Sequence, residues 1–129
     1  MPLTTAGTEV ENFIENKLEH HGYNVESQVA SSGINKDWSR IDLVIVDDAF
    51  DFAEAISLKY QDVAGTAEEK LLYEAENLSL MCYAHKYHSG TIVLCGTGWS
   101  PVKYYWFLNE YEPPSNVRII SYDEFVQEY

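Results

Sequence analysis

Residues 40–61 restrict the fold more than any other stretch, because they form two apolar runs joined by turn chemistry. The first run, Arg40 to Asp47, is apolar apart from one early acid, Asp42. The second run, Phe50 to Gln61, is strand-like and ends in Ser-Leu-Lys-Tyr-Gln. The Asp- and Ala-containing segment between them is typical of a tight turn. The stretch therefore predicts an antiparallel hairpin.

The register of this hairpin places polar side chains together. Strands joined by a short turn lie with the start of one beside the end of the other. If the turn centres near Ala49 or Phe50, Asp42 lies opposite Ser57 to Lys59. An acid, a hydroxyl and a lysine are thus expected at one end of the hairpin. A structural ion pair between a buried lysine and a lone carboxylate fits the same pattern.

Both faces of the hairpin are apolar by period-two alternation. Residues of one parity share one face, and those of the other parity point the opposite way: Ile41, Leu43, Ile45, Ile56 and Leu58 against Val44, Val46, Ala53 and Ala55. A strand pair with two apolar faces is covered on both sides, as in a sheet between helices.

The chain of 129 residues has the length of one domain, taken as residues 1–129, with 46% hydrophobic and 22% charged residues. It lacks an apolar run long enough for a membrane span, and its N-terminus lacks a secretion signal. Cys82 and Cys95 lie in apolar runs and fit small core residues. A cytoplasmic location is expected.

The net charge is −13, from 21 acidic residues against 8 lysines and arginines. Such a balance opposes nonspecific nucleic-acid binding, which needs positive charge near phosphates. Divalent cations offset part of any carboxylate cluster.

The rest of the chain alternates helices and strands. A helix capped at Thr8, with Glu11 in a capping box, ends near Gly22. The further expected elements are a strand at 23–30, a helix at 66–86, a strand at 91–95, a helix at 101–111, a strand at 117–121 and a helix at 122–129. The order α-β-β-β-α-β-α-β-α predicts an α/β fold with a mixed sheet and helices on both faces.

This order, with Asp42 in RIDLVIV, Lys59 in ISLKYQ and Glu11 in the first helix, resembles the PD-(D/E)xK nuclease superfamily. The resemblance covers nearly the whole chain. It implies a restriction-endonuclease-like three-layer α-β-α sandwich with a central mixed β-sheet. The small layout is similar to that of archaeal Holliday-junction resolvases and phage-type nucleases.

The resemblance also implies metal-dependent cleavage of DNA, with Mg²⁺ or Mn²⁺ as cofactor. Asp42 would be the main metal ligand and the backbone carbonyl of Leu58 the second. Lys59 would position or deprotonate the attacking water, or bind the scissile phosphate, and Gln61 would hold the same water or a phosphate oxygen. Glu11 matches a first-helix glutamate found near the metal in many members.

The sequence departs from the superfamily pattern at Ser57, which stands where an acid is usual. Glu74 and Glu69, from the following helix, are the candidate replacements. Glu54 is a weaker one, because strand alternation points it away from Lys59. If none reaches the metal, the chain is an inactive member.

Lys70, Lys36 and Arg40 are the candidate cations for the DNA, although Lys70 also fits a solvated pair with Glu74. The aromatic segment from Trp99 to Phe107 suits core packing of a short helix, stacking on unpaired bases, or a homodimer interface. The alternative function is that of an acidic, non-catalytic binding protein, such as a DNA mimic or inhibitor. The charge of −13 motivates it.

Overall fold

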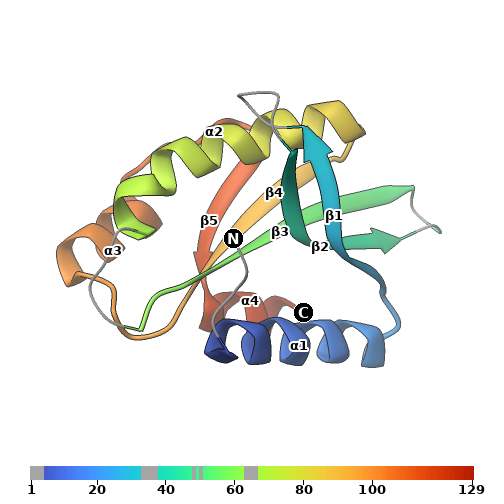
Figure 1. The fold of residues 1–129 in the computed structure, drawn as a ribbon, viewed down its shortest axis with the longest axis horizontal. Helices are drawn as coiled ribbons and strands as arrows, with labels where there is room; N and C mark the ends of the chain where they lie inside the picture. The colour runs from blue at the N-terminus through green and yellow to red at the C-terminus, as the bar shows by residue number, and fades with distance from the viewer. Residues whose placement is uncertain (1–4, 33–37, 48, 50, 63–66) are drawn as a thin grey trace.

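The computed structural model describes residues 5–32, 38–47, 49, 51–62 and 67–129. Helices and strands follow one another in the predicted order (Figure 1). Their bounds are α1 Thr5–His20, β1 Asn24–Ser32, β2 Trp38–Asp47, β3 Phe52–Tyr60, α2 Ala67–His85, β4 Ser89–Cys95, α3 Pro101–Asn109, β5 Val117–Ser121 and α4 Tyr122–Glu128.

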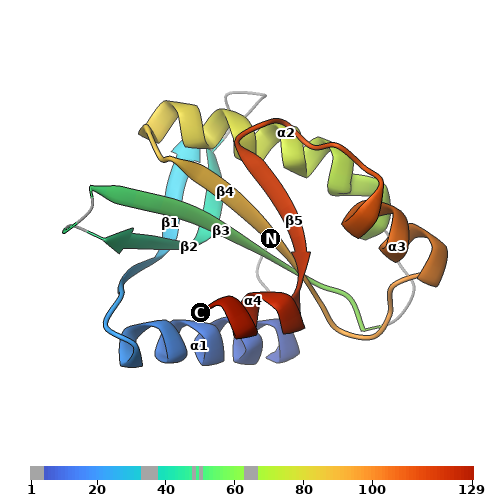
Figure 2. The same ribbon diagram turned by 180° about the vertical axis from the view of Figure 1, so that it is seen from behind.

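The strands of the described chain form one mixed sheet in the order β1-β2-β3-β4-β5. β1, β2 and β3 are antiparallel neighbours, whereas β4 pairs parallel to both β3 and β5. Parallel neighbours need a crossover, and α2 and α3 provide the two crossovers. Figure 2 shows β5 at the sheet edge opposite β1.

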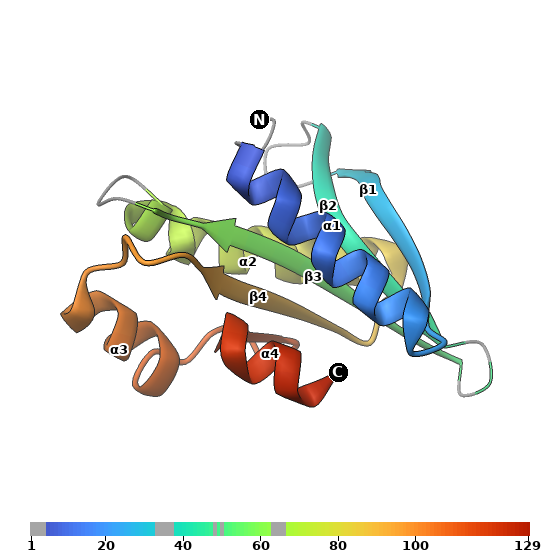
Figure 3. The same ribbon diagram turned by 90° about the horizontal axis from the view of Figure 1, so that it is seen from below.

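Helices cover both faces of the sheet, which confirms the expected three-layer α-β-α sandwich (Figure 1). α2 and α3 pack on one face, where a stripe of α2 side chains is buried with Phe107 of α3: Leu71, Ala75, Leu78 and Cys82. α1 and α4 pack on the other face through Ile14, Leu18 and Phe125 (Figure 3). These two clusters are called the α2-side core and the α1-side core below. The central strands β2, β3 and β4 carry apolar residues of both parities and so supply apolar side chains to both cores.

The hairpin forms with the predicted register. Asp47 pairs with Phe52 and Leu43 pairs with Ile56, so the turn centres between residues 49 and 50. The expected bounds differ mainly at the first helix, where Thr8 lies inside α1 rather than capping it. β1 starts one residue later than expected and runs on to Ser32. The predicted start of α2 at Thr66 lies outside the described residues.

Cys82 and Cys95 are both free and buried, as expected of small core residues. Within the described part of the chain, none of the helices combines the length and the apolar character needed to cross a membrane.

Candidate active site

In both β1 and β2, side chains of the same parity change from one face of the sheet to the other at one position of the β1–β2 pairing. In β2, Ile41 packs into the α2-side core, whereas Leu43 packs into the α1-side core. Regular alternation would put both on the same face. Across the ladder in β1, Gln28 has a positive φ of 51° between residues paired with Leu43 and Ile41. The face therefore changes in both strands at Gln28 and Asp42.

Asp42 lies where β2 separates from β3. The β2–β3 pairing ends at Leu43 opposite Ile56, although both strands continue among the described residues. Leu58 stays paired with Val93 of β4, but on its other edge the backbone pairing with β2 has ended, and there its N–H donates to Asp42 Oδ2 at 2.7 Å. In a strand the N–H and C=O of one residue leave on the same edge. The carbonyl of Leu58 therefore faces the Asp42 side as well.

Burial raises the pKa of the Asp42 carboxyl from 3.8 to about 6. The Leu58 N–H and the charge of Lys59 lower this pKa, whereas the carboxylates of Glu11 and Glu74 raise it further. Ionising Asp42 therefore costs more free energy in the folded protein than in water, at a place where two other acids and one lysine lie nearby.

Lys59 and Glu74 meet across the gap between β3 and α2. Lys59 Nζ lies 2.6 Å from Glu74 Oε2, with about a quarter of each side chain exposed. Their approach is not aligned as a hydrogen bond, and Glu74 Oε2 is buried without a hydrogen-bond partner among the described residues. The predicted pairing of Lys70 with Glu74 is replaced by this contact. Lys70 itself is exposed on α2.

Glu11 reaches the same region from α1. It is 7% exposed and accepts a hydrogen bond of 2.8 Å from Gln28 Nε2. This contact ties α1 to the residue that faces Asp42 across the β1–β2 ladder. The strands and two helices thus bring together Asp42, Lys59, Glu74 and Glu11.

Glu68 is a buried acid that the sequence reasoning missed. Its Oε1 accepts from Gln61 Nε2 at 3.0 Å and from Ser100 N–H at 2.6 Å. Lys103 Nζ lies 3.8 Å from its Oε2. Helical periodicity could have found it, because Glu68 continues the buried stripe of Leu71 and Ala75 toward the helix start.

Glu54 lies apart from this group. Its two oxygens lie 2.9 and 3.1 Å from the hydroxyl of Tyr129, and Oε1 also accepts from Thr91 Oγ1 at 3.1 Å. Arg118 lies 3.7 Å from the same oxygen. Regular alternation turns Glu54 toward α4, on the face opposite Lys59, as the sequence predicts, so Glu54 is not brought together with Asp42 and Lys59.

Other predicted site residues contribute less to the geometry. Ser57 is half-buried on β3 and supplies no carboxylate. Lys36 lies outside the described residues, as do the side chains of Arg40 and Glu69. On α3, Phe107 is buried, whereas Tyr105 and Trp106 are exposed.

The donor set suits a hard divalent cation, which prefers oxygen ligands. Asp42 and Glu74 interact electrostatically, the buried Glu74 Oε2 lacks a hydrogen bond, and the Leu58 carbonyl faces the same side. Among the described residues no three His, Cys, Asp or Glu side chains are placed to hold one ion together. Mg²⁺ fits such a site because it keeps several waters and binds one or two carboxylates.

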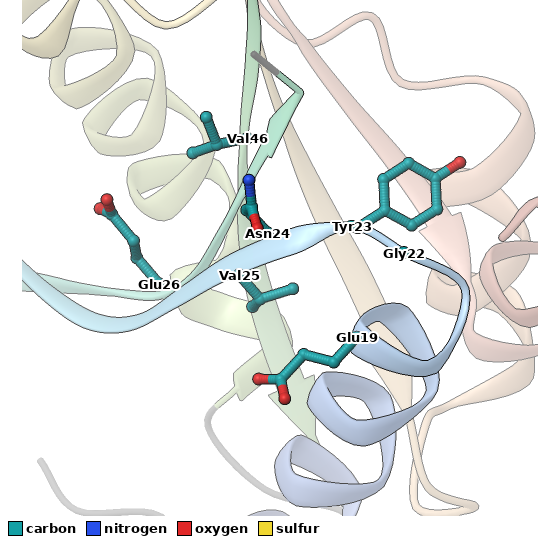
Figure 4. A pocket seen from close by; sticks show the side chains of 7 residues that line it. All are labelled: Glu19, Gly22, Tyr23, Asn24, Val25, Glu26 and Val46. Carbon is teal, nitrogen blue, oxygen red and sulfur yellow. The ribbon is translucent and has the colours of Figure 1, made fainter. Parts of the chain in front are cut away.

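A surface hollow of about 700 Å³ lies elsewhere, between the end of α1 and the start of β1 (Figure 4). Its lining includes Glu19, Tyr23, Glu26 and Val46. Its lining includes none of the grouped acids. The chemistry described above is therefore not that of this hollow.

Comparisons with known proteins agree with the geometry. A family model described as a PD-(D/E)XK nuclease superfamily domain matches residues 4–128. The crystal structure of a protein of unknown function, AF1548, is similar with a TM-score of 0.54 and 16% sequence identity. The similarity covers 88% of this chain but only 56% of that one, and at this identity it supports the fold alone. No curated protein gives a significant match.

Proposed function

Because the chain belongs to the PD-(D/E)XK nuclease superfamily, we propose that it hydrolyses DNA phosphodiester bonds with the help of a divalent cation. The observation that carries this proposal is the meeting of Asp42 and the Lys59–Glu74 pair where β2 leaves β3. The pKa of Asp42 is raised beside other acids, and strongly shifted pKa values are concentrated at functional sites.

Asp42, Glu74 and the Leu58 carbonyl would hold the cation. A bound Mg²⁺ or Mn²⁺ would supply positive charge at the scissile phosphate and acidify a water. The Leu58 N–H would hold the Asp42 carboxylate in place through its hydrogen bond to Oδ2. Glu11 adds negative charge from α1, which strengthens attraction for a cation.

Besides the cation, the site would have one positive charge from the protein itself, the ammonium group of Lys59. Lys59 Nζ lies 2.6 Å from Glu74 Oε2. Lys59 would stabilise the negative charge that develops on the phosphate oxygens during hydrolysis. Glu74 would be both a ligand of the cation and the partner of the Lys59 ammonium, so the cation and Lys59 would compete for it.

Cleavage is tested with supercoiled, branched and single-stranded DNA in Mg²⁺ or Mn²⁺. We expect at least one substrate to be cut, and Asp42→Ala and Lys59→Ala to abolish the cutting. Glu11→Ala and Glu74→Ala should shift the Mg²⁺ dependence to higher concentration. The matched control is Glu76→Ala, which removes an exposed acid from the same helix as Glu74.

A second function is favoured by the net charge of −13 and by the closed Lys59–Glu74 pair. An acidic, non-catalytic protein would bind a basic partner in the manner of a DNA mimic. If none of the three DNA forms is cut with either metal, and Mg²⁺ leaves thermal stability unchanged, this second function replaces the first.

A further inference from the structure

Gln61 has a buried acceptor without a partner. Its side chain is 5% exposed, and among the described residues nothing donates to its Oε1. Gln61 directly follows β3, two positions after Lys59, so the two residues lie about 7 Å apart along an extended chain. Lys59 contacts Glu74 and Gln61 contacts Glu68, so both side chains lie on the α2 face of the sheet. A buried amide oxygen left unpaired is costly, which indicates that it receives a donor when the site is in use.

The orientation of this amide is dictated by its neighbours. Gln61 Nε2 donates to Glu68 Oε1 at 3.0 Å and to the Gly98 carbonyl at 2.9 Å. Both neighbours are acceptors only, so turning the amide over would set its oxygen against two other oxygens. The position of Glu68 is fixed in turn by Ser100 N–H, at 2.6 Å from the same Oε1.

The main chain of Gln61 is clamped by the segment that follows β4. Gln61 N–H donates to Cys95 O at 3.0 Å, and Gly98 N–H donates to Gln61 O at 2.8 Å. Gly96 has φ +90°, and a Cβ there would lie 2.3 Å from Gln61 O. Backbone and amide nitrogen are thus both held, and only the amide oxygen remains available.

We propose that Glu68 is a positioning residue that fixes the Gln61 amide so that Oε1 accepts a hydrogen bond from the attacking water. This inference rests on the proposed nuclease function. The amide hydrogens are already used, so Gln61 cannot donate to a phosphate oxygen, which was the other role considered for it. Gln61 transfers no proton. It orients the water, while Lys59 supplies positive charge on the same face.

The variants test three things separately: the acceptor oxygen of Gln61, the orientation of its amide by Glu68, and the negative charge of Glu68. Gln61→Met keeps the length of the side chain and removes the amide. Glu68→Leu removes the acceptor that holds Gln61 Nε2 and Ser100 N–H, whereas Glu68→Gln retains an Oε1 for both donors. Glu76→Leu makes the same change at an exposed position of α2. Cleavage is measured under single-turnover conditions with saturating DNA and Mg²⁺, on protein shown by its thermal transition to be folded.

We expect Gln61→Met and Glu68→Leu to slow cleavage roughly 10- to 100-fold with unchanged DNA affinity, as misplacement of a reacting group does. Glu68→Gln and Glu76→Leu should stay within about threefold of the parent. The double variant Gln61→Met/Glu68→Leu should be no slower than Gln61→Met, because both changes remove one interaction. Equal losses in Glu68→Gln and Glu68→Leu, or parental cleavage by Gln61→Met, would overturn the inference.

A measurement independent of cleavage tests the orientation. In ¹⁵N-labelled protein, the side-chain amide hydrogens of Gln61 should exchange slowly with solvent in the parent and in Glu68→Gln, and rapidly in Glu68→Leu. Equal exchange in all three contradicts the positioning role. If the parent cuts no DNA, the nuclease function and the water-holding role of Gln61 fall together. If it cuts DNA and Gln61→Met is equally fast, only the inference about Gln61 and Glu68 fails.

Discussion

Replacing Asp42 by asparagine should stabilise the protein at neutral pH. Burial and the neighbouring acids Glu11 and Glu74 raise the pKa of Asp42 from 3.8 to about 6. At about 1.36 kcal/mol per pKa unit, ionising Asp42 in the folded protein costs about 3 kcal/mol more than in the unfolded chain. The asparagine side chain would carry no charge, and its amide oxygen would still accept from Leu58 N–H.

The sign of the pH dependence follows from the raised pKa. Below pH 3.8 the carboxyl is neutral in both states and costs nothing. Between 3.8 and about 6 the unfolded chain ionises first, so the stability of the parent falls as pH rises, and above 6 the full cost is present. Roughly half of the cost has developed at about pH 5, so the advantage of Asp42→Asn should grow by about 1.5 kcal/mol between about pH 5 and about pH 8.

The assay is urea unfolding of parent and Asp42→Asn at these two pH values, with and without millimolar Mg²⁺. Groups that titrate equally in both proteins cancel in the difference. A binding cation stabilises the folded parent and should narrow the gap at the higher pH. A difference that stays flat or shrinks as pH rises would refute the account of a costly buried charge. A gap that Mg²⁺ leaves unchanged would instead remove Asp42 from the metal site.

Three further predictions concern other parts of the site. Lys59→Met should abolish cleavage and raise the affinity for Mg²⁺, because Lys59 no longer competes with the cation for Glu74. Calorimetric titration with Mg²⁺ measures this affinity, and weaker binding than in the parent would contradict the competition. Glu54→Ala should lower the free energy of unfolding by about 2–4 kcal/mol, because it breaks a buried network, yet leave cleavage by the folded fraction unchanged. A loss of cleavage at parental stability would place Glu54 in the site after all. Gly96→Ala should destabilise by about 2 kcal/mol or more in urea unfolding and also slow cleavage, since its Cβ would displace the Gln61 backbone; a neutral result would show that the clamp on Gln61 is loose.

The sequence by itself determined the hairpin and its register. Apolar residues of both parities in strands β2 and β3 required a cover on each face, which the helices supply. The turn position set the register, and the register placed Asp42 level with Ser57 and near Lys59. These features are local: each depends on alternation, turn chemistry and sequence spacing within about twenty residues.

Only the tertiary structure decided which acids join Asp42. The change of face at Gln28 and Asp42 breaks the period-two rule, and the separation of β2 from β3 frees the Leu58 N–H for the carboxylate. Neither follows from residue spacing, because both depend on how β1 and β2 pack against the helices on either side.

The choice among the helix acids was likewise tertiary. Glu68 lies in the buried stripe of α2, whereas Glu74 borders that stripe six residues further along the helix. Glu68 meets Gln61 just after the end of β3 and Glu74 meets Lys59, because α2 runs back alongside β3 toward its start. A helical pattern fixes which side chains point toward the sheet. The crossing of helix and strand, set by the packing of whole layers, fixes which strand residue each one reaches.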